Sequence, residues 1–594
     1  MSGNLINLGN WDQCKSSGGK FRGRHCLLYI VLDKERPQDI SYVPHNVPII
    51  YSLCVPEICA ASELTELLSK EISVLGTNSS TLVVKCSLDD PSWGVWEIAG
   101  GSALTVLSLI IVSSTALDVF WTDGYKGYNG LFTSFSVRRN WAMLPKTKKT
   151  PFSCLDGLKT FLQFSVIAYH TWRDILRNAV PVVNKFSLNE LLRSYRSFVA
   201  QMPIMVDSFF VISGCLVMFS LLSKKAEKTS IWRTLINRVL RVYPAYFVIL
   251  LAETSLTGFI CDGPLCTTIV RKKQDNCRQY WWYNVFLIHN IHPGIQFSCL
   301  PPSWYIAVDI QLFVLFVPLI AYGIGKNVKA TMWFIGGLAG CSVIAVFIQV
   351  LLMNLGTDTL AVENIENENL YMVTLYTQVH SRLSSWAIGL LLGAFMRRQE
   401  SKKITVKKEL AIALWILVGL TVSGFLLLSV PMQKEDYVYN NVIAAFYNAL
   451  WSPVWCLGNC WIIFACCSGY SDCINPILSS KPLRILGKLS YCAFMVHQLV
   501  VNLLFSELRA PIYITSLQQA TLIFGAIVIS YLFATVLYLT VEGPFVNVQS
   551  FTQGIGRSKA KESAAVTARG QESSQSSMGL SNSTVLDNFY SSND

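Results

Sequence analysis

The chain has 594 residues, of which 52% are hydrophobic and only 14% are charged, with a formal net charge of +11. Soluble proteins carry charged residues at about a quarter of their positions, so this composition excludes an ordinary soluble protein. Apolar runs of about 20 residues recur from residue 96 to residue 541, long enough to cross a bilayer as helices and too continuous for a β-barrel. The positive charge fits basic loops beside a membrane and does not require a nucleic-acid partner.

The segment 1–95 reads as a small extracytoplasmic domain. Its opening, MSGNLINLGNWDQCKSS, lacks the charged and apolar regions of a signal peptide. A glycosylation sequon at Asn78 and an abundance of cysteines are typical of a disulfide-rich domain in an oxidising compartment. The cysteines are Cys14, Cys26, Cys54, Cys59 and Cys86. Because their number is odd, we expect that the true N-terminus, with a signal peptide and a further cysteine, lies upstream of this sequence; the alternative is one free thiol.

Eleven apolar segments predict an all-α polytopic membrane protein with about eleven transmembrane helices. They are centred on residues 98–120, 154–172, 203–222, 236–258, 304–324, 331–353, 380–397, 409–430, 443–467, 488–506 and 519–541. Basic residues gather in loops that the positive-inside rule assigns to the cytoplasm. These loops are 121–153, 223–235, 325–330, 397–408 and 468–487. The opposite loops are less basic, although 173–202 carries five Lys or Arg residues.

Cysteine usage favours the same orientation and completes the domain organisation. The loop 259–303 holds an even set of four cysteines, which suits two disulfides on the side of the N-terminal domain: Cys261, Cys266, Cys277 and Cys299. The polar, serine-rich end of the chain predicts a disordered cytoplasmic tail. The expected units are the cysteine-rich domain (1–95), a first transmembrane helix (96–121), a cytoplasmic linker (122–150), a ten-helix membrane domain (151–545) and the tail (546–594).

The second apolar segment, LDGLKTFLQFSVIAYHTW, carries ionisable side chains at both ends. Lys159 and His170 are eleven positions apart, about three helical turns, so both project from one face about 16 Å apart along the axis. They could engage two parts of one long ligand, since ionisable residues at membrane depth are commonly functional. The alternative is that both reach water, with Lys159 contacting Asp156 at i,i+3.

Three further groups of polar residues are candidates for a site. Arg238 and Arg241, at i and i+3 in NRVLRVYPAY, form a basic stripe at the cytoplasmic interface that suits a phosphate-bearing ligand or, alternatively, lipid phosphate. Asp309, with Gln311, lies in PPSWYIAVDIQLF at the start of the fifth segment. His497 lies in YCAFMVHQLVV of the tenth, where it could also be a hydrogen-bonded packing group.

Together these stretches resemble the membrane acyltransferase 3 family. The family's first motif is similar to LDGLKTFLQFSVIAYH, and its FFVLSGFL segment is similar to SFFVISGCL. Its RxxR motif corresponds to the pair Arg238 and Arg241. LSYCAFMVH and VEGPF resemble its late SYxxYLxH and ExPF segments. The N-terminal LGNWDQC, FRGRHC and YSLCVPEIC, with SWYIAVDIQLF, resemble the nose-resistant-to-fluoxetine branch. The sequence departs at Lys159, where arginine is commoner, and at Pro302, where that branch usually has a histidine.

The resemblance implies transfer of an acyl group from acyl-CoA to a hydroxyl of a lipid or other small acceptor. On it, His170 is the general base, Asp309 or His497 orients or assists, and Lys159, Arg238 and Arg241 bind the donor. No metal-ligand spacing is present. The alternative hypothesis is a lipid or small-molecule transporter on the same fold, and a third hypothesis is a scaffold without catalytic activity. The expected location is the plasma membrane or endoplasmic reticulum, with the C-terminus cytoplasmic.

Overall fold

The computed structural model describes most of the chain. The described residues are 6–16, 22–32, 49–74, 80–87, 93–120, 131–146, 150–176, 181–184, 199, 201–223, 231–291, 297–357, 368–402, 405–433 and 437–549. Asn78 and the tail beyond residue 549 lie outside them, and the first four residues of the predicted tail continue the last helix.

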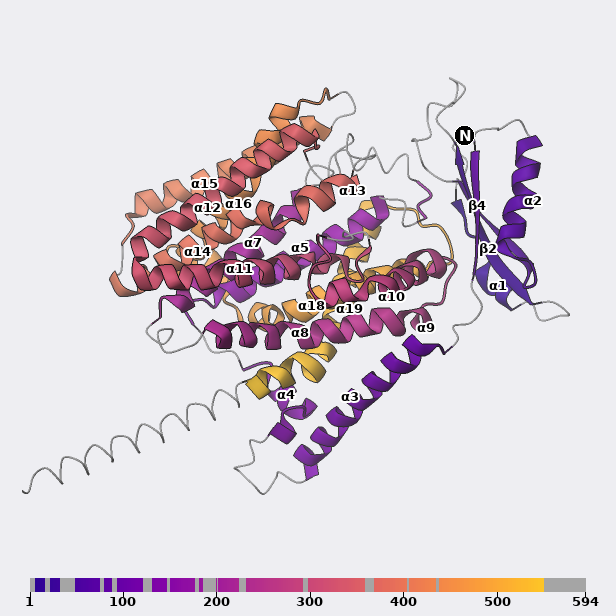
Figure 1. The fold of residues 1–594 in the computed structure, drawn as a ribbon, viewed down its shortest axis with the longest axis horizontal. Coiled ribbons are helices and arrows are strands. Elements are labelled where there is room, and N and C mark those ends of the chain that lie inside the picture. Colours follow the sequence, from indigo (N-terminus) through magenta and orange to yellow (C-terminus); the bar gives the residue numbers. More distant parts are fainter. Residues whose placement is uncertain are drawn as a thin grey trace, which may run out of the picture.

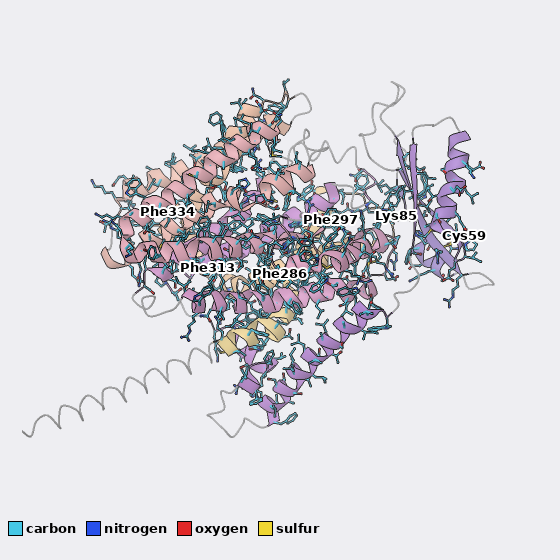
Figure 2. The ribbon with its side chains drawn as sticks, viewed as in Figure 1. Cys59, Lys85, Phe286, Phe297, Phe313 and Phe334 are labelled. Carbon is cyan, nitrogen blue, oxygen red and sulfur yellow. A yellow bond between two sulfur atoms is a disulfide. The ribbon has the colours of Figure 1, made fainter. Side chains whose placement is uncertain are left out.

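The N-terminal domain is a four-stranded sheet with two helices. Its elements are β1 (Ile6–Asn7), α1 (Trp11–Lys15), β2 (Gly23–Leu32), β3 (Ile49–Pro56), α2 (Ala61–Val74) and β4 (Ser80–Cys86). The strand order is β1-β3-β2-β4, with β2 antiparallel to both β3 and β4. Disulfides join Cys14 to Cys54 and Cys26 to Cys86. The odd cysteine is Cys59, a free thiol on this domain (Figure 2).

Each of the eleven predicted spans coincides with a long helix. These helices are α3 (Val95–Phe120), α5 (Cys154–Leu176), α7 (Met205–Leu221), α8 (Ile231–Ser255), α11 (Trp304–Lys326), α12 (Val328–Met353), α14 (Val379–Lys402), α15 (Lys408–Ser429), α16 (Asn441–Ser468), α18 (Lys481–Ser506) and α19 (Ser516–Leu537). Shorter helices are α4 (Val137–Met143), α9 (Thr257–Ile260), α10 (Lys272–Val285), α13 (Glu368–Tyr371) and α17 (Ile474–Leu478). The fold is therefore an all-α polytopic membrane bundle with a small disulfide-bonded domain containing strands.

Nine helices within the described ranges are long and apolar enough to cross a membrane by length and composition. The two remaining predicted spans, α5 and α14, carry more polar residues, and both lie within the bundle rather than at its edge (Figure 1). By contrast α3 and α15 lie along its edges, and only 11% and 6% of their apolar windows are buried (Figure 1). Apolar side chains such as Phe334, 47% exposed, face outwards (Figure 2). Interior position thus explains why α5 and α14 tolerate polar groups.

Glycines let the central helices touch backbone to backbone. A Cβ on Gly214 of α7 would lie 2.3 Å from the carbonyl oxygen of Trp386 in α14, and one on Gly389 would lie 2.4 Å from that of Val211. In a membrane the hydrophobic effect does not drive helices together, because lipid is as apolar as their side chains. Close van der Waals packing at small residues such as these glycines holds the helices together instead. In the same way, a Cβ on Gly487 of α18 would lie 2.3 Å from the carbonyl oxygen of Asp156 in α5.

The N-terminal domain is tied to one face of the bundle. Asp262 accepts from Lys15 (3.3 Å) and from Arg509 (2.9 Å), and Arg509 also pairs with Asp12 at 3.3 Å. Leu265 of the bundle packs into the core of the small domain. The loop beneath it is closed by the disulfides Cys261–Cys266 and Cys277–Cys299, as the sequence predicts. All four disulfides therefore lie on or beside this face.

Candidate active site

One face of α5 points into the bundle. Lys159, Gln163, Val166 and His170 follow each other at intervals of four, three and four residues, so they share that face. Val166 and His170 line a cavity of about 350 Å³. Gln163, midway between Lys159 and His170, is fully buried, and neither its amide nitrogen nor its oxygen has a hydrogen-bond partner among the described residues. α5 therefore turns Gln163, Val166 and His170 towards the interior, whereas Lys159 is not among the residues that line the cavity.

The cavity is mostly apolar and aromatic, with a few polar groups. Its walls come from α5, α7, α10, α11 and α18 and from the segments before α7, α10, α11 and α14. The lining residues are Val166, Tyr169, His170, Arg173, Met202, Pro203, Val206, Ile269, Lys273, Pro301, Pro302, Trp304, Tyr305, Met372, Tyr376, Phe494, Gln498 and Asn502. Concave, largely apolar pockets with a small number of polar groups are typical of ligand sites.

The structure places His497 beside His170, although they come from different helices. Their ring centroids are 5.0 Å apart. His497 Nδ1 lies 2.7 Å from the backbone oxygen of Phe494. Because a carbonyl oxygen can only accept, Nδ1 carries the proton and Nε2 presents a lone pair. In the part of the chain that the structure describes, this buried Nε2 has no hydrogen-bond partner. The pair thus combines two imidazoles, one of them in a defined tautomer.

Asp309 is held away from the histidines. It forms an ion pair with Arg238, and Ser213 donates to its other oxygen at 2.6 Å while accepting from Arg238 at 2.9 Å. Tyr305 lines the cavity one turn before Asp309 and lies within electrostatic range of Asp309 and Arg238. The ion pair therefore supports the cavity wall through Tyr305 rather than meeting the imidazoles.

The two arginines of the predicted stripe differ in their surroundings. Arg238 forms an ion pair with Asp309 and lies over the ring of Phe313 at 4.4 Å, contacts that the sequence did not predict. A buried carboxylate offers the guanidinium a better partner than the interface does. Arg241 remains exposed. Lys159 donates to Asp156 at 3.2 Å, the predicted i,i+3 contact.

Glu542 links the two cations that remain at this end. It is buried in the closing VEGPF segment and lies within electrostatic range of both Arg241 and Lys159. Cys492 donates to its carboxylate at 2.9 Å. Lys159 and Arg241 are therefore both close enough to this buried carboxylate to act on it electrostatically. None of Lys159, Arg238 and Arg241 is among the residues that line the cavity.

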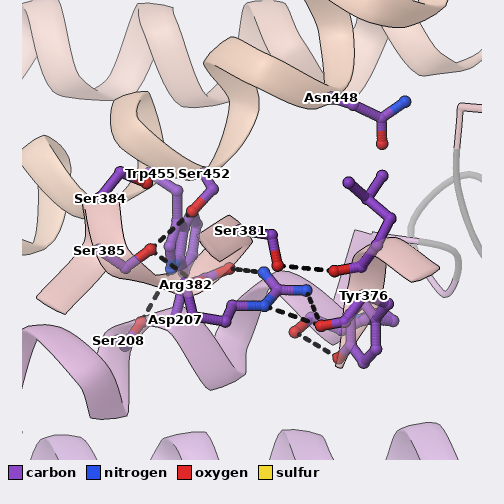
Figure 3. Close-up of polar contacts among 12 residues, drawn as sticks. Asp207, Ser208, Tyr376, Ser381, Arg382, Ser384, Ser385, Asn448, Ser452 and Trp455 are labelled. Carbon is purple, nitrogen blue, oxygen red and sulfur yellow. Dashed lines mark hydrogen bonds and ion pairs between the residues drawn. The ribbon is translucent and has the colours of Figure 1, made fainter. Parts of the chain in front are cut away.

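A buried polar network between α7 and α14 was not predicted from the sequence (Figure 3). Asp207 accepts from Arg382 at 2.8 Å and from Ser385 at 2.8 Å, and Ser385 lies 2.7 Å from Ser452. Arg382 also donates twice to the backbone oxygen of Tyr376, at 3.0 and 2.7 Å. A charge in each of two apolar segments, at Asp207 and Arg382, was the available signal, because buried charges are paired.

This network contacts two of the aromatic residues that line the cavity. The Arg382 guanidinium lies 4.5 Å from the Tyr376 ring centroid and 5.5 Å from that of Trp304, and both rings line the cavity. Cation–π contacts of this kind fix the orientation of aromatic rings. A change in the network would therefore alter the positions of two rings that shape the cavity.

A histidine also lies close to the departure at Pro302. His289, from the segment after α10, places Nε2 2.9 Å from the hydroxyl of Ser303 and is fully buried. Tyr246 is 3.5 Å from the same hydroxyl. The sequence places no histidine directly before Ser303, but the fold brings one to its side chain. Within the described ranges no cluster of three or more His, Cys, Asp or Glu could hold a metal ion.

Comparison with known proteins identifies the family of the chain. The family model described as "Acyltransferase domain" matches residues 152–538, more than half of the chain. Nose resistant to fluoxetine protein 6 of Caenorhabditis elegans is 23% identical over 630 residues, which cover 92% of this chain and 75% of that protein. O-acetyltransferase OatA of Staphylococcus aureus is 25% identical over 413 residues, which cover 66% of this chain and 56% of the bacterial protein. No solved structure matches. This chain of multiple membrane-spanning helices therefore belongs to the acyltransferase-domain family.

Proposed function

We propose that the protein transfers an acyl group from acyl-CoA to a hydroxyl of a lipid or other small acceptor bound in the cavity, with His170 as the general base. The observation that carries this proposal is the pair of imidazoles, 5.0 Å apart, at the wall of a 350 Å³ apolar cavity. An imidazole with an ordinary pKa of about 6.5 can accept a hydroxyl proton near neutral pH.

The proposed step is a direct displacement at the thioester carbonyl. The acceptor oxygen attacks the carbonyl carbon while His170 takes the hydroxyl proton. The carbon–oxygen bond forms, the carbon–sulfur bond breaks, and the CoA thiolate leaves and takes the proton from the imidazolium. The lone pair on His497 Nε2 is available to accept an N–H of His170, which would orient its other nitrogen towards the acceptor.

The other end of α5 supports a role in donor binding. Lys159 and Arg241 are cations that suit the phosphates of CoA, and Lys159 lies about 16 Å from His170 along the helix. The arm of CoA between phosphate and sulfur has about 13 bonds and spans about 15 Å when extended, on the chain dimensions of an extended backbone. The distance between the cations and the base thus matches the donor. Arg238, already neutralised by Asp309, would contribute through Tyr305 and the cavity wall.

The arrangement of disulfides supports an orientation. We place the N-terminal domain outside the cytoplasm, because all four disulfides lie on or beside its face and disulfides persist in oxidising compartments. Lys159 then lies near the cytoplasm, where CoA is available, and the cavity opens nearer the opposite side. The plasma membrane and the endoplasmic reticulum both meet these conditions.

Release of CoA from radiolabelled acetyl-CoA or palmitoyl-CoA by the purified protein tests the proposal. We expect His170→Ala to lower turnover by about 10²–10⁴-fold, the range for loss of general-base catalysis. His380→Ala is the matched control, because His380 bonds to Gln349 at 2.7 Å and is not among the cavity residues. Equal turnover of wild type and His170→Ala would contradict the proposal.

A second candidate is transport of a lipid or small molecule without catalysis. The observation that favours it is that the cavity lining includes none of the three basic residues proposed to bind the donor. Proteoliposomes distinguish the two functions. Flux of a labelled lipid that persists in His170→Ala, together with no CoA release by the wild type, would establish the transporter.

A further inference from the structure

Arg173 is a charged cavity residue without a counter-charge. It lines the cavity one turn beyond His170 and is half-buried. None of the ion pairs or hydrogen bonds among the residues that the structure describes involves Arg173. Lys273, the second cation of the lining, is already paired with Glu253 at 2.8 Å. A guanidinium in a mostly apolar cavity therefore remains available for an anionic group of a ligand.

Gln498 presents an acceptor to the same cavity. Its amide nitrogen donates to Asp174 at 3.3 Å and to Asn502 at 2.9 Å, which fixes the orientation of the amide. Its oxygen is buried and has no hydrogen-bond partner within the described part of the chain, and the residue is 8% exposed. A buried carbonyl oxygen without a donor costs free energy, and a ligand hydroxyl supplies that donor.

The remaining walls suit a hydrocarbon chain. Trp304, Tyr305, Tyr376 and Phe494 contribute aromatic rings, and methionine side chains add adaptable apolar surface. The volume of about 350 Å³ is at the low end for ligand sites, so it accommodates a headgroup with the first part of one chain. The lining thus combines an anion site, a hydroxyl site next to a histidine, and an apolar wall.

We propose that this cavity binds a single-chain lipid that carries both an anionic phosphate and a free hydroxyl, with the phosphate on Arg173 and the hydroxyl between Gln498 and His170. That this lipid is also the acyl acceptor rests on the function proposed above. Its binding does not, because Arg173, Gln498 and the aromatic walls are present whatever the chemistry.

Three probes of one chain length separate the two polar contacts in binding experiments on the full-length, detergent-purified protein. Oleoyl lysophosphatidate has the phosphate and the hydroxyl, mono-oleoylglycerol has hydroxyls alone, and oleyl phosphate has the phosphate alone. We expect lysophosphatidate to bind most tightly. Arg173→Gln should weaken lysophosphatidate by about 10-fold, equivalent to about 1.4 kcal/mol, and leave mono-oleoylglycerol within about twofold.

Gln498→Leu should give the complementary pattern. It should weaken lysophosphatidate and mono-oleoylglycerol and leave oleyl phosphate unchanged, because only the hydroxyl contact is lost. Lys272→Gln is the charge-matched control: Lys272 is exposed, precedes Lys273 in the chain and is not among the cavity residues. It should not change binding of any of the three probes. If Arg173→Gln fails to fold, Arg173→Lys keeps the charge, loses the two-pronged geometry and should weaken lysophosphatidate selectively.

The outcomes separate this inference from the proposed function. Equal affinity for lysophosphatidate and mono-oleoylglycerol in the wild type would overturn it, as would an unchanged lysophosphatidate affinity in folded Arg173 variants. Arg173-dependent binding without acylation of the bound lipid would uphold the binding site and refute the acyltransferase. Acylation of mono-oleoylglycerol alone would uphold the acyltransferase and refute the anionic acceptor.

Discussion

The α7–α14 pair and the α5–α18 pair are packed alike but treat their buried polar groups differently. In both pairs a glycine allows backbone contact. Between α7 and α14, the charged pair Asp207 and Arg382 is satisfied by its own contact, by Ser385 and by the Tyr376 carbonyl, whereas Nε1 of Trp386 has no partner in the described structure. On α5 and α18, Gln163, His497 and Gln498 each keep a buried atom without a partner in the described structure.

This difference separates polar groups that build the membrane domain from polar groups that await a ligand. Satisfied networks in a low-dielectric interior are rigid, whereas an unsatisfied buried atom costs about 1–3 kcal/mol. The comparison therefore assigns α7–α14 to architecture and α5–α18 to binding and chemistry.

The largest stability effect is expected in the satisfied pair. Asp207→Leu leaves Arg382 buried without its carboxylate and should lower the free energy of unfolding by about 3–5 kcal/mol. The double variant Asp207→Leu/Arg382→Met should recover part of that loss, since neither charge remains. Thermal unfolding of the detergent-solubilised protein measures both. Arg397→Met is the control, because its partner Glu400 is 60% exposed and such pairs contribute little. If Asp207→Leu were as stable as the wild type, the Asp207–Arg382 pair could not be a structural element of the membrane domain.

A smaller effect of opposite sign is expected at Gln163. Gln163→Leu removes two polar atoms without partners, so stability should stay equal or rise by up to about 1 kcal/mol. The same substitution at Gln311 is the matched control. Gln311 donates to the Leu287 carbonyl at 2.6 Å and to Asn290 at 3.0 Å, so its loss should destabilise by about 1–3 kcal/mol. Equal destabilisation by both variants would show that the Gln163 side chain does make stabilising hydrogen bonds in the folded protein.

The smallest effect extends the comparison to the N-terminal domain. Burial lowers the pKa of His25 below its ordinary value of 6.5, and a bond to the Leu8 carbonyl partly opposes the shift. A histidine that is neutral when folded takes up a proton on unfolding, so its domain should be fully stable above about pH 6.5 and lose stability as the pH falls below it. Hydrogen exchange of the β2 amides between pH 5 and 7 measures this loss. His25→Gln should make exchange protection independent of pH in that range.

The sequence predicted the membrane fold well because lipid imposes a strong local rule. A segment must be apolar over about 20 residues to span, and all eleven predicted segments are helices. Helical periodicity also placed Lys159 and His170 on one inward face. The odd cysteine count of residues 1–95 correctly implied one cysteine without a partner in that segment, and the structure shows that it is Cys59.

What the sequence missed depends on which helices become neighbours. Arg238 meets Asp309 across 71 residues, and Asp207 meets Arg382 across 175. Periodicity states the face on which a side chain lies, but not the helix that this face meets. For that reason the ion pair of Arg238 with Asp309 was not predicted, and Arg173 and Gln498 were recognised as cavity residues only in three dimensions.

The contact of Gly487 with Asp156 gives the two imidazoles an unusual mechanical setting. His170 lies 14 residues beyond Asp156 and His497 lies 10 residues beyond Gly487, so the rings sit at the ends of lever arms of about 21 and 15 Å. The glycine contact sets the spacing of the two helices at this level. A relative tilt of about 5° there would separate the rings by about 1.5 Å, as lever arms of about 15–21 Å imply. A single added methyl group at Gly487 would therefore be felt several turns away, at the histidines.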